Sequence, residues 1–373
     1  MSGIEMLRAG HGDSLLVAYG DPAAPHHILI DGGPYYTYSA GAFVARTTLS
    51  ERVQQLIEAG YPLDLLVITH IDADHIEGAV KLLANWPKNL KIEDVWFNAW
   101  RHLKQDPGDL LGPIQGEMLS ALIQKRELRW NQVLGGNAIA VTPGHALRPI
   151  ELPGGMKLTL LSPTPVELAV LRRTWENELR TAGLDPDSPE AALERLKKDQ
   201  RLRPDDIDDL LGERRLDIEA LAGKSFESDT SPANGTSIAF IAEFEGKRCL
   251  FAGDAHPTVL EASIRQWLHE RGESRLRLDA FKLPHHGSKS NLSPELLELV
   301  ECKRYLISTN GRYFGHPDEE ALARIVVRGG EPVLCFNYRT DKSAVWDDVD
   351  LKQDYGYQTV YGDERDGGLI VDL

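Results

Sequence analysis

The chain has 373 residues, of which 42% are apolar, and a net charge of −16 at pH 7. This length and apolar content allow a large buried core, in one large domain or two. The acidic balance argues against a broad nucleic-acid-binding face, because affinity for a polyanion comes largely from Lys and Arg side chains. It does not exclude a phosphodiesterase whose bound cations supply positive charge locally.

The sequence also favours a cytoplasmic protein. No apolar run approaches the ~20 residues of a membrane span. The first five residues contain no basic segment followed by an apolar one, so we expect no signal peptide. Cys249, Cys302 and Cys335 lie far apart in apolar surroundings, which favours reduced thiols over a disulfide framework.

Strand-like and helix-like patterns alternate along most of the chain. Short apolar runs predict strands at residues 4–9, 14–19, 27–30, 63–68, 95–97, 156–161, 236–244, 248–251, 277–283, 305–308 and 332–336, the last of these being the final core strand. Helical spacing predicts helices at residues 51–59, 74–83, 110–133, 258–271, 293–300 and 317–327. Ser293 is expected to be an N-cap, with Pro294 at the first helical position. We predict an α/β fold with helices outside two sheets, an αββα sandwich, as one domain over residues 1–373.

Residues 165–228 differ in composition from the rest of the chain. They contain 16 Asp or Glu against 11 Lys or Arg, in helix-compatible spacing. Such a charged run predicts a solvated helical insertion. The alternative is a lid over a functional site or a surface that docks a protein partner.

The most informative motif follows the apolar run at residues 63–68. Within six residues the chain places His70, Asp72, Asp74 and His75, followed by a helical pattern. A strand end can hold imidazoles and carboxylates rigidly around one or two divalent cations. The motif therefore predicts a metal site, the alternative being a solvated acidic turn.

Further polar residues stand at the ends of other predicted strands. Asp31 precedes two glycines, and Asp254 ends an apolar run that finishes in Gly-Asp. His285 and His286 follow the strand at 277–283, and His316 precedes a predicted helix. Each has an ordinary explanation as a turn or surface residue. Their joint occurrence matters, because metal sites are assembled from several loops at one rim of a sheet.

The order of these motifs resembles the metallo-β-lactamase superfamily, and the expected fold becomes a metallo-β-lactamase-like sandwich with a charged helical insertion. The segments at residues 10–14, 29–33 and 283–288 are similar, more narrowly, to the soluble hydrolase domain of ComEC-type DNA-uptake proteins. The resemblance covers residues 1–80 and 230–330. The membrane channel of ComEC is missing here, so the resemblance implies no role in DNA uptake.

The resemblance implies two metal positions. His70 and Asp72 would bind one ion, Asp74, His75 and His286 would bind the second, and Asp254 would bridge the two. Asp31 would anchor the ligand loop by hydrogen bonds.

The chain departs from the commoner superfamily pattern in two places. Asp72 stands where His is usual, and the loop at residues 228–237 lacks the His expected as a third ligand to the first ion. Asp229, Asn234 or a water molecule are the candidates for that position. The oxygen-rich set makes manganese or magnesium plausible beside zinc, so we expect two divalent ions, Zn²⁺ or Mn²⁺.

The implied chemistry is hydrolysis by a metal-bridging hydroxide. Asp74 would orient that hydroxide, and His316 or an unligated His285 would protonate the leaving oxygen. For the two histidines, support of the ligands is the alternative role. Ser288 either holds a phosphate oxygen or only positions His286.

Three functions fit the sequence. The first is a dinuclear phosphodiesterase or nuclease that acts on single-stranded nucleic acid or nucleotides. The second is a hydrolase of a lactone, thioester or β-lactam on the same fold. The third is a non-catalytic interaction protein of a multi-gene, defence-like system, with residues 165–228 docking a partner.

Overall fold

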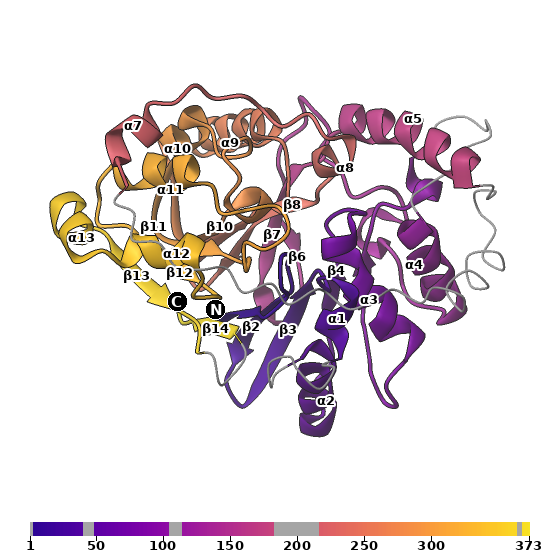
Figure 1. Cartoon of the computed structure of the whole chain (residues 1–373). Helices are drawn as coiled ribbons and strands as arrows, with labels where there is room; N and C mark the ends of the chain where they lie inside the picture. The colour runs from indigo at the N-terminus through magenta and orange to yellow at the C-terminus, as the bar shows by residue number, and fades with distance from the viewer. Residues whose placement is uncertain (1–2, 40–47, 104–113, 183–215, 364–367) are drawn as a thin grey trace.

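The computed structural model describes residues 3–39, 48–103, 114–182, 216–363 and 368–373. Two β-sheets pack face to face, and helices cover their outer faces (Figure 1). The predicted αββα sandwich is therefore confirmed.

The first sheet has six strands, and both terminal segments of the chain belong to it. Its spatial order is β14 (Gly368–Val371), β1 (Gly3–Leu7), β2 (Leu15–Asp21), β3 (Ala24–Ile30), β4 (Leu65–Val67) and β5 (Val95–Trp96). The strands from β3 to β5 run parallel, with Ile30 opposite Val67. Strand β14 closes the sheet by pairing antiparallel with β1, so that Ile4 faces Val371.

The second sheet has eight strands. Its order is β13 (Gln358–Tyr361), β12 (Val333–Phe336), β11 (Val300–Ile307), β10 (Leu276–Lys282), β9 (Lys247–Phe251), β8 (Ala239–Phe244), β7 (Lys157–Ser162) and β6 (Ile150–Glu151). The five strands from β9 to β13 are parallel. Their carboxyl ends meet at one edge, where loops of α/β proteins commonly build sites.

Neighbouring side chains along the strands of the first sheet belong to two different buried clusters. Ile28 and Ile30 of β3, like Val67 of β4, belong to the cluster between the sheets. Leu29 and Leu66, which point the other way, join the cluster beneath the outer helices. Successive side chains of a strand point to opposite faces, so this two-sided apolar pattern requires cover on both faces of the sheet.

Helices supply that cover. Beside the first sheet lie α1 (Tyr35–Tyr38), α2 (Leu49–Ala59), α3 (Ala73–Ala84), α4 (Ile114–Lys125) and α5 (Pro165–Ala182); beside the second lie α9 (Pro257–Arg271), α10 (Pro294–Leu299) and α11 (Glu319–Val326) (Figure 1). Shorter helices are α7 (Ile218–Ala222), α8 (Pro232–Gly235), α12 (Asp341–Ala344) and α13 (Val349–Tyr355). No helix among the described residues has both the length and the apolar character to cross a membrane.

The predicted boundaries need three comments. The Ser293 side chain caps α10 by accepting from Leu296 N, as predicted. The helix predicted at 110–133 ends at Lys125, because Glu127 adopts a left-handed φ of 54°; residues 104–113 lie outside the described part. The prediction of 332–336 as the last core strand is wrong, since β13 and β14 follow it.

Both ends of the charged segment at 165–228 pack on the fold. In α5, Leu168, Leu171 and Trp175 are buried against the helical layer of the first sheet. Helix α7 lies against α11, and α5 also contacts α8. The proposed lid or docking role falls largely on residues 183–215, which lie outside the described part, and stays a prediction.

The three cysteines are free thiols, as expected. Burial raises the pKa of the Cys249 thiol to about 12, so it is fully protonated at neutral pH. Cytoplasmic location stays a prediction.

Candidate metal centre

Loops from both sheets meet at the carboxyl edge. Asp31 follows β3 and His70 follows β4 in the first sheet, while Asp254 follows β9 and His286 follows β10 in the second. All four side chains are buried. Residues that lie up to 255 positions apart in the sequence thus face one another across the sandwich.

Asp31 organises the first loop, as expected. Its carboxylate accepts hydrogen bonds from the Thr69 backbone amide and the Thr69 hydroxyl, both at 2.7 Å. The same carboxylate lies 2.8 Å from His75 Nδ1. Asp31 itself has a left-handed φ of 60°, which turns the chain directly after β3. It therefore fixes the ligand loop without pointing into the centre.

The three buried histidines share one arrangement of their ring nitrogens. Nδ1 of His70 lies 3.0 Å from the Thr69 hydroxyl, whose own proton goes to Asp31. Nδ1 of His75 faces Asp31, and Nδ1 of His286 lies 2.9 Å from the carbonyl oxygen of Ser308. Each Nδ1–H therefore donates outward, and each Nε2 is turned toward the centre. Histidines that bind metals are oriented in this way.

Two carboxylates lie among these nitrogens. Asp254 Oδ2 is 3.4 Å from His75 Nε2 and 3.7 Å from His70 Nε2. Asp74 Oδ2 is 3.2 Å from His286 Nε2 and 3.9 Å from His75 Nε2. Both acids thus lie within 4 Å of the His75 ring nitrogen.

Several atoms of this cluster lack partners that their burial would require. His70 Nε2, His75 Nε2 and Asp254 Oδ1 have no hydrogen-bond partner among the described residues. An unpaired buried polar atom is costly, and a buried charge more so. A divalent cation would satisfy all three atoms, so the residues present fit the metal ions that the sequence implies.

The electrostatics of the metal-free centre point the same way. Burial alone would raise the pKa of Asp74, but the charge of His75 and the hydrogen bond with His286 outweigh it and lower that pKa to about 2. Burial lowers the pKa of His286, yet Asp13 and Asp254 outweigh it and raise it to about 9. The carboxylates are therefore ionised and His286 carries a proton that a bound cation would replace.

The remaining predicted residues Asp72, His316 and Ser288 lie around this cluster. Asp72 is the N-cap of α3 but makes no capping hydrogen bond; its side chain is 42% exposed, with Oδ2 3.7 Å from His70 Nε2. His316 lies at the rim, its ring centre 4.9 Å from that of His285. Ser288 is buried, and its hydroxyl accepts from Ser290 N at 3.2 Å. That hydrogen bond favours the loop-positioning role of Ser288.

Sequence reasoning missed the residues that support the ligands from outside. Asp13 Oδ2 lies 2.7 Å from Lys282 Nζ, and Asp13 Oδ1 lies 3.4 Å from His286 Nδ1. Asp13, His75 and His286 are close enough to suggest a metal triad. Because Asp13 faces the outward Nδ1 of His286, we interpret it as support rather than a ligand. The glycine before Asp13 was a sequence signal for this contact, because glycine often marks a close approach of two backbones. A Cβ at Gly12 would lie 1.9 Å from the Asp74 carbonyl oxygen.

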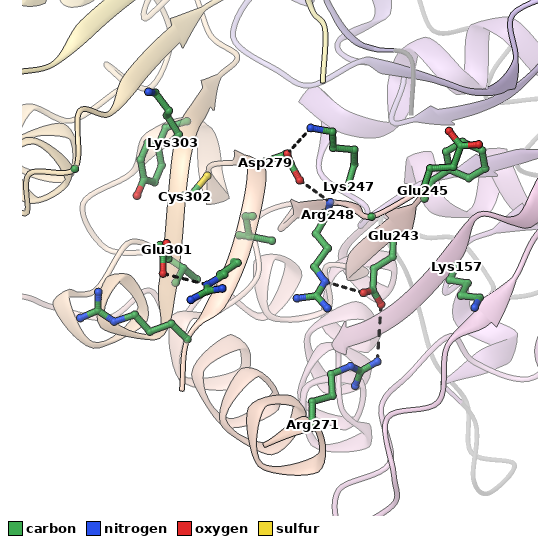
Figure 2. A pocket seen from close by; sticks show the side chains of 18 of the residues that line it. Lys157, Glu243, Glu245, Lys247, Arg248, Arg271, Asp279, Glu301, Cys302 and Lys303 are labelled. Carbon is green, nitrogen blue, oxygen red and sulfur yellow. Dashed lines mark hydrogen bonds and ion pairs between the residues drawn. The ribbon is translucent and has the colours of Figure 1, made fainter. Parts of the chain in front are cut away.

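A cavity of about 1290 Å³ opens at the opposite edge of the second sheet. Figure 2 shows it lined by charged side chains, with Arg248 and Arg271 both directed at Glu243 and Lys247 paired with Asp279. None of the predicted site residues lines it. The candidate centre is therefore the carboxyl edge and not this cavity.

Comparison with known proteins agrees with this geometry. Residues 8–155 match the family model of the metallo-β-lactamase superfamily. No curated protein matches the chain significantly. Members of the superfamily typically bind two divalent ions, and the His/Asp cluster fits such a pair.

Three solved structures resemble the chain at low similarity. The first is a mutant of the CmlA beta-hydroxylase, with 11% identity over 100% of this chain and 54% of that chain and a TM-score of 0.41. The second is CmlA from Streptomyces venezuelae, described as a diiron beta-hydroxylase, with 12% identity over 100% of this chain and 55% of that chain and a TM-score of 0.40. The third is Zn²⁺-bound PqqB from Methylobacterium extorquens, with 12% identity over 97% of this chain and 88% of that chain and a TM-score of 0.35. The chain thus spans about half the length of the CmlA proteins. The narrower resemblance to ComEC-type proteins stays a prediction.

Proposed function

We propose that this chain, which carries a metallo-β-lactamase superfamily domain over residues 8–155, is a dinuclear metal-dependent phosphodiesterase of nucleic acid or nucleotides. The observation that carries the proposal is the convergence of three imidazole Nε2 atoms and two buried carboxylates at one edge of the sandwich. The atoms without hydrogen-bond partners at that place support it.

The proposed ligands divide into two groups around Asp254. His70 and Asp72 are assigned to one ion and Asp74, His75 and His286 to the other, and Asp254 Oδ2 lies within 4 Å of both His70 Nε2 and His75 Nε2. This division keeps the assignment implied by the sequence. A pair of divalent ions at ~3.5–4 Å lowers the pKa of a shared water and neutralises phosphoryl oxygens.

The chain's own residues supply orientation and proton transfer. Asp74 is ionised and buried at the first turn of α3, where it would hold the attacking water by a hydrogen bond. We assign protonation of the leaving oxygen to His316. Its Nδ1 lies 3.4 Å from the Asp318 carboxylate, which also accepts from Lys289 N, and that negative charge favours a protonated His316 ring.

The rim beside His316 supports a substrate with flat rings. Tyr313 is 73% exposed and Phe314 is 49% exposed. The Tyr313 ring stacks on His11 at 4.9 Å, and the Phe314 ring lies roughly parallel to His316 at 6.3 Å. Exposed aromatic side chains next to a phosphate site are suited to stacking nucleobases of a single strand.

Asp72 favours this activity over the hydrolysis of lactones, thioesters or β-lactams, because such enzymes normally keep His at that position. We keep as a further prediction that residues 165–228 contact a protein partner.

The test is hydrolysis by protein loaded separately with Zn²⁺, Mn²⁺ or Mg²⁺. Bis-p-nitrophenyl phosphate, labelled single-stranded DNA, labelled RNA and nucleotides are the substrates, and a lactone and nitrocefin are the comparison. We expect phosphodiester cleavage, reduced by about a hundredfold or more in Asp74→Asn. No phosphodiester turnover with any of the three metals would reject the proposal.

A further inference from the structure

The first metal position has fewer protein ligands than the second. The assignment implied by the family resemblance gives it His70, Asp72 and the shared Asp254, whereas the second has Asp74, His75, His286 and Asp254. The loop at 228–237, where a further ligand would be expected, contains no His. Asp229, Asn234 and His285 are the described residues that could take the place of that ligand.

Asp229 is already committed to hydrogen bonds. Its Oδ1 accepts from Ser231 N at 2.8 Å, and its Oδ2 accepts from Asn234 Nδ2 at 2.7 Å and from Asn291 Nδ2 at 2.9 Å. It therefore acts as an acceptor that fixes the two amides. Asn234 Oδ1 is buried without a hydrogen-bond partner among the described residues, and it remains the competing candidate.

His285 is held with one ring nitrogen directed at the centre. Its Nε2 lies 3.8 Å from Asp254 Oδ2, the same oxygen that is 3.7 Å from His70 Nε2. Two ligands of one tetrahedral ion at zinc–ligand distances of ~2.0–2.1 Å lie about 3.3–3.5 Å apart. Each of the two nitrogens is thus placed, relative to Asp254 Oδ2, close to the separation that two ligands of one ion require.

Asn291 fixes the tautomer of His285. The Asn291 amide group is fully buried and donates from Nδ2 to Asp229 Oδ2 and to the Asp254 carbonyl oxygen, at 2.9 and 3.1 Å. Its Oδ1 therefore faces His285 Nδ1, at 3.0 Å, as an acceptor. The Asn234 amide nitrogen lies 3.3 Å from the same Nδ1, farther than the Asn291 oxygen, and Asp229 Oδ2 lies at 3.6 Å. The two acceptors favour the tautomer with the proton on Nδ1, whose Nε2 presents its lone pair to the centre.

The backbone is strained where this placement is made. His285 and His286 have φ values of 46° and 55°, both in the left-handed region that residues other than glycine rarely adopt. This turn sends two consecutive imidazoles to different carboxylates, His285 toward Asp254 and His286 toward Asp74. Strain of this kind persists where the surrounding structure and function require it.

We propose that His285 Nε2 is the missing protein ligand of the first metal ion, in place of a His from the 228–237 loop. The first ion then has His70, His285, Asp72 and the shared Asp254. Each position has two imidazole nitrogens and a carboxylate of its own, so both are occupied to similar extents. The inference rests on the proposed dinuclear centre, and it removes His285 from the candidates for the proton donor.

The experiment counts histidine ligands and bound ions in the full chain. In Co²⁺-loaded wild-type protein, each ligand histidine keeps an exchangeable Nδ1–H whose proton resonance is shifted by the ion. We expect four such resonances, from His70, His75, His285 and His286. Three resonances would overturn the proposal without any variant.

Calorimetric titration of metal-free protein with Zn²⁺ gives the second measurement. His285→Ala should retain one tight site and weaken the other by at least about a hundredfold. His316→Ala is the matched control, since it removes the adjacent imidazole and should keep both sites. Loss of a site in Asn234→Ala, with two sites retained in His285→Ala, would assign the ligand to Asn234 and overturn the proposal.

The outcomes separate this inference from the proposed function. Two ions and four histidine ligands without phosphodiester cleavage would reject the activity and keep the ligand assignment. Phosphodiester cleavage with only three histidine ligands would keep the activity and reject the assignment of His285 as a ligand.

Discussion

The buried ion pair behind the metal centre allows a quantitative prediction. Asp13 Oδ2 and Lys282 Nζ lie 2.7 Å apart, and the two side chains are 2% and 1% exposed. Asp13→Asn would leave the Lys282 ammonium without its anionic partner and with only neutral acceptors, such as the Leu283 carbonyl oxygen at 3.0 Å. Breaking one partner of a buried pair costs about 3–5 kcal/mol, because the other charge stays buried without compensation.

The assay is urea unfolding of the metal-free wild type and Asp13→Asn, followed by circular dichroism. Glu301→Gln is the control: its ion pair with Arg277 is 57% and 78% exposed, and such a pair contributes about 0–1 kcal/mol. The double variant Asp13→Asn/Lys282→Met should recover part of the loss, since it removes both charges. Equal free energies of unfolding for Asp13→Asn and Glu301→Gln would refute the reasoning.

The same pair has a defined pH dependence. Burial alone would raise the pKa of Asp13, but the charges of Lys282 and His286 outweigh it and hold that pKa well below its usual range. A carboxyl group whose pKa is depressed in the folded state stabilises fully above its unfolded pKa of about 4, and this contribution falls as the pH drops below that value. The stability difference between wild type and Asp13→Asn should therefore be largest near neutral pH and shrink below pH ~4. A difference that stayed constant down to acid pH would contradict the assignment.

Three further predictions concern the ligand loop, the rim and the packing of α3. Asp31→Ala should weaken zinc affinity by about 10–100-fold in calorimetric titration, since it frees Thr69 and His75; unchanged affinity would show that Asp31 supports no ligand. Tyr313→Ala should raise KM for single-stranded DNA by about tenfold, because each base–aromatic stack is worth ~1–3 kcal/mol. KM for an abasic oligonucleotide should stay unchanged, and an equal rise of KM for both substrates would exclude stacking. Gly78→Ala should destabilise the fold by more than about 3 kcal/mol in thermal unfolding, because its Cβ would lie 1.9 Å from the Gly32 carbonyl oxygen, and wild-type stability would mean that α3 can shift.

Local patterns in the sequence were enough to predict much of the fold. Alternating apolar residues indicated most strands, and Ser293 followed by Pro294 marked the start of α10. These features are local, since they depend on a few neighbouring residues and on the faces that a strand or helix presents. The same holds for the ligand loop from His70 to His75, whose residues are adjacent in the chain.

Other elements depend on contacts between distant residues. Strand β14 is four residues long and forms because it completes the edge beside β1, more than 360 positions earlier. Helix α4 ends early because Glu127 adopts a left-handed conformation, which its residue type does not signal. Short range patterns carry no information on either event.

The candidate site divides in the same way. The sequence by itself determined which ligand types this chain offers and that they stand at strand ends, because the order of residues fixes the chemistry of each loop. Only the tertiary structure decided which atoms face one another: His285 turns toward Asp254 because Asn291 and a left-handed backbone hold it there, and Asp13 finds Lys282 across the sandwich. Those orientations come from hydrogen bonds and burial between segments far apart in the chain, which no local pattern encodes.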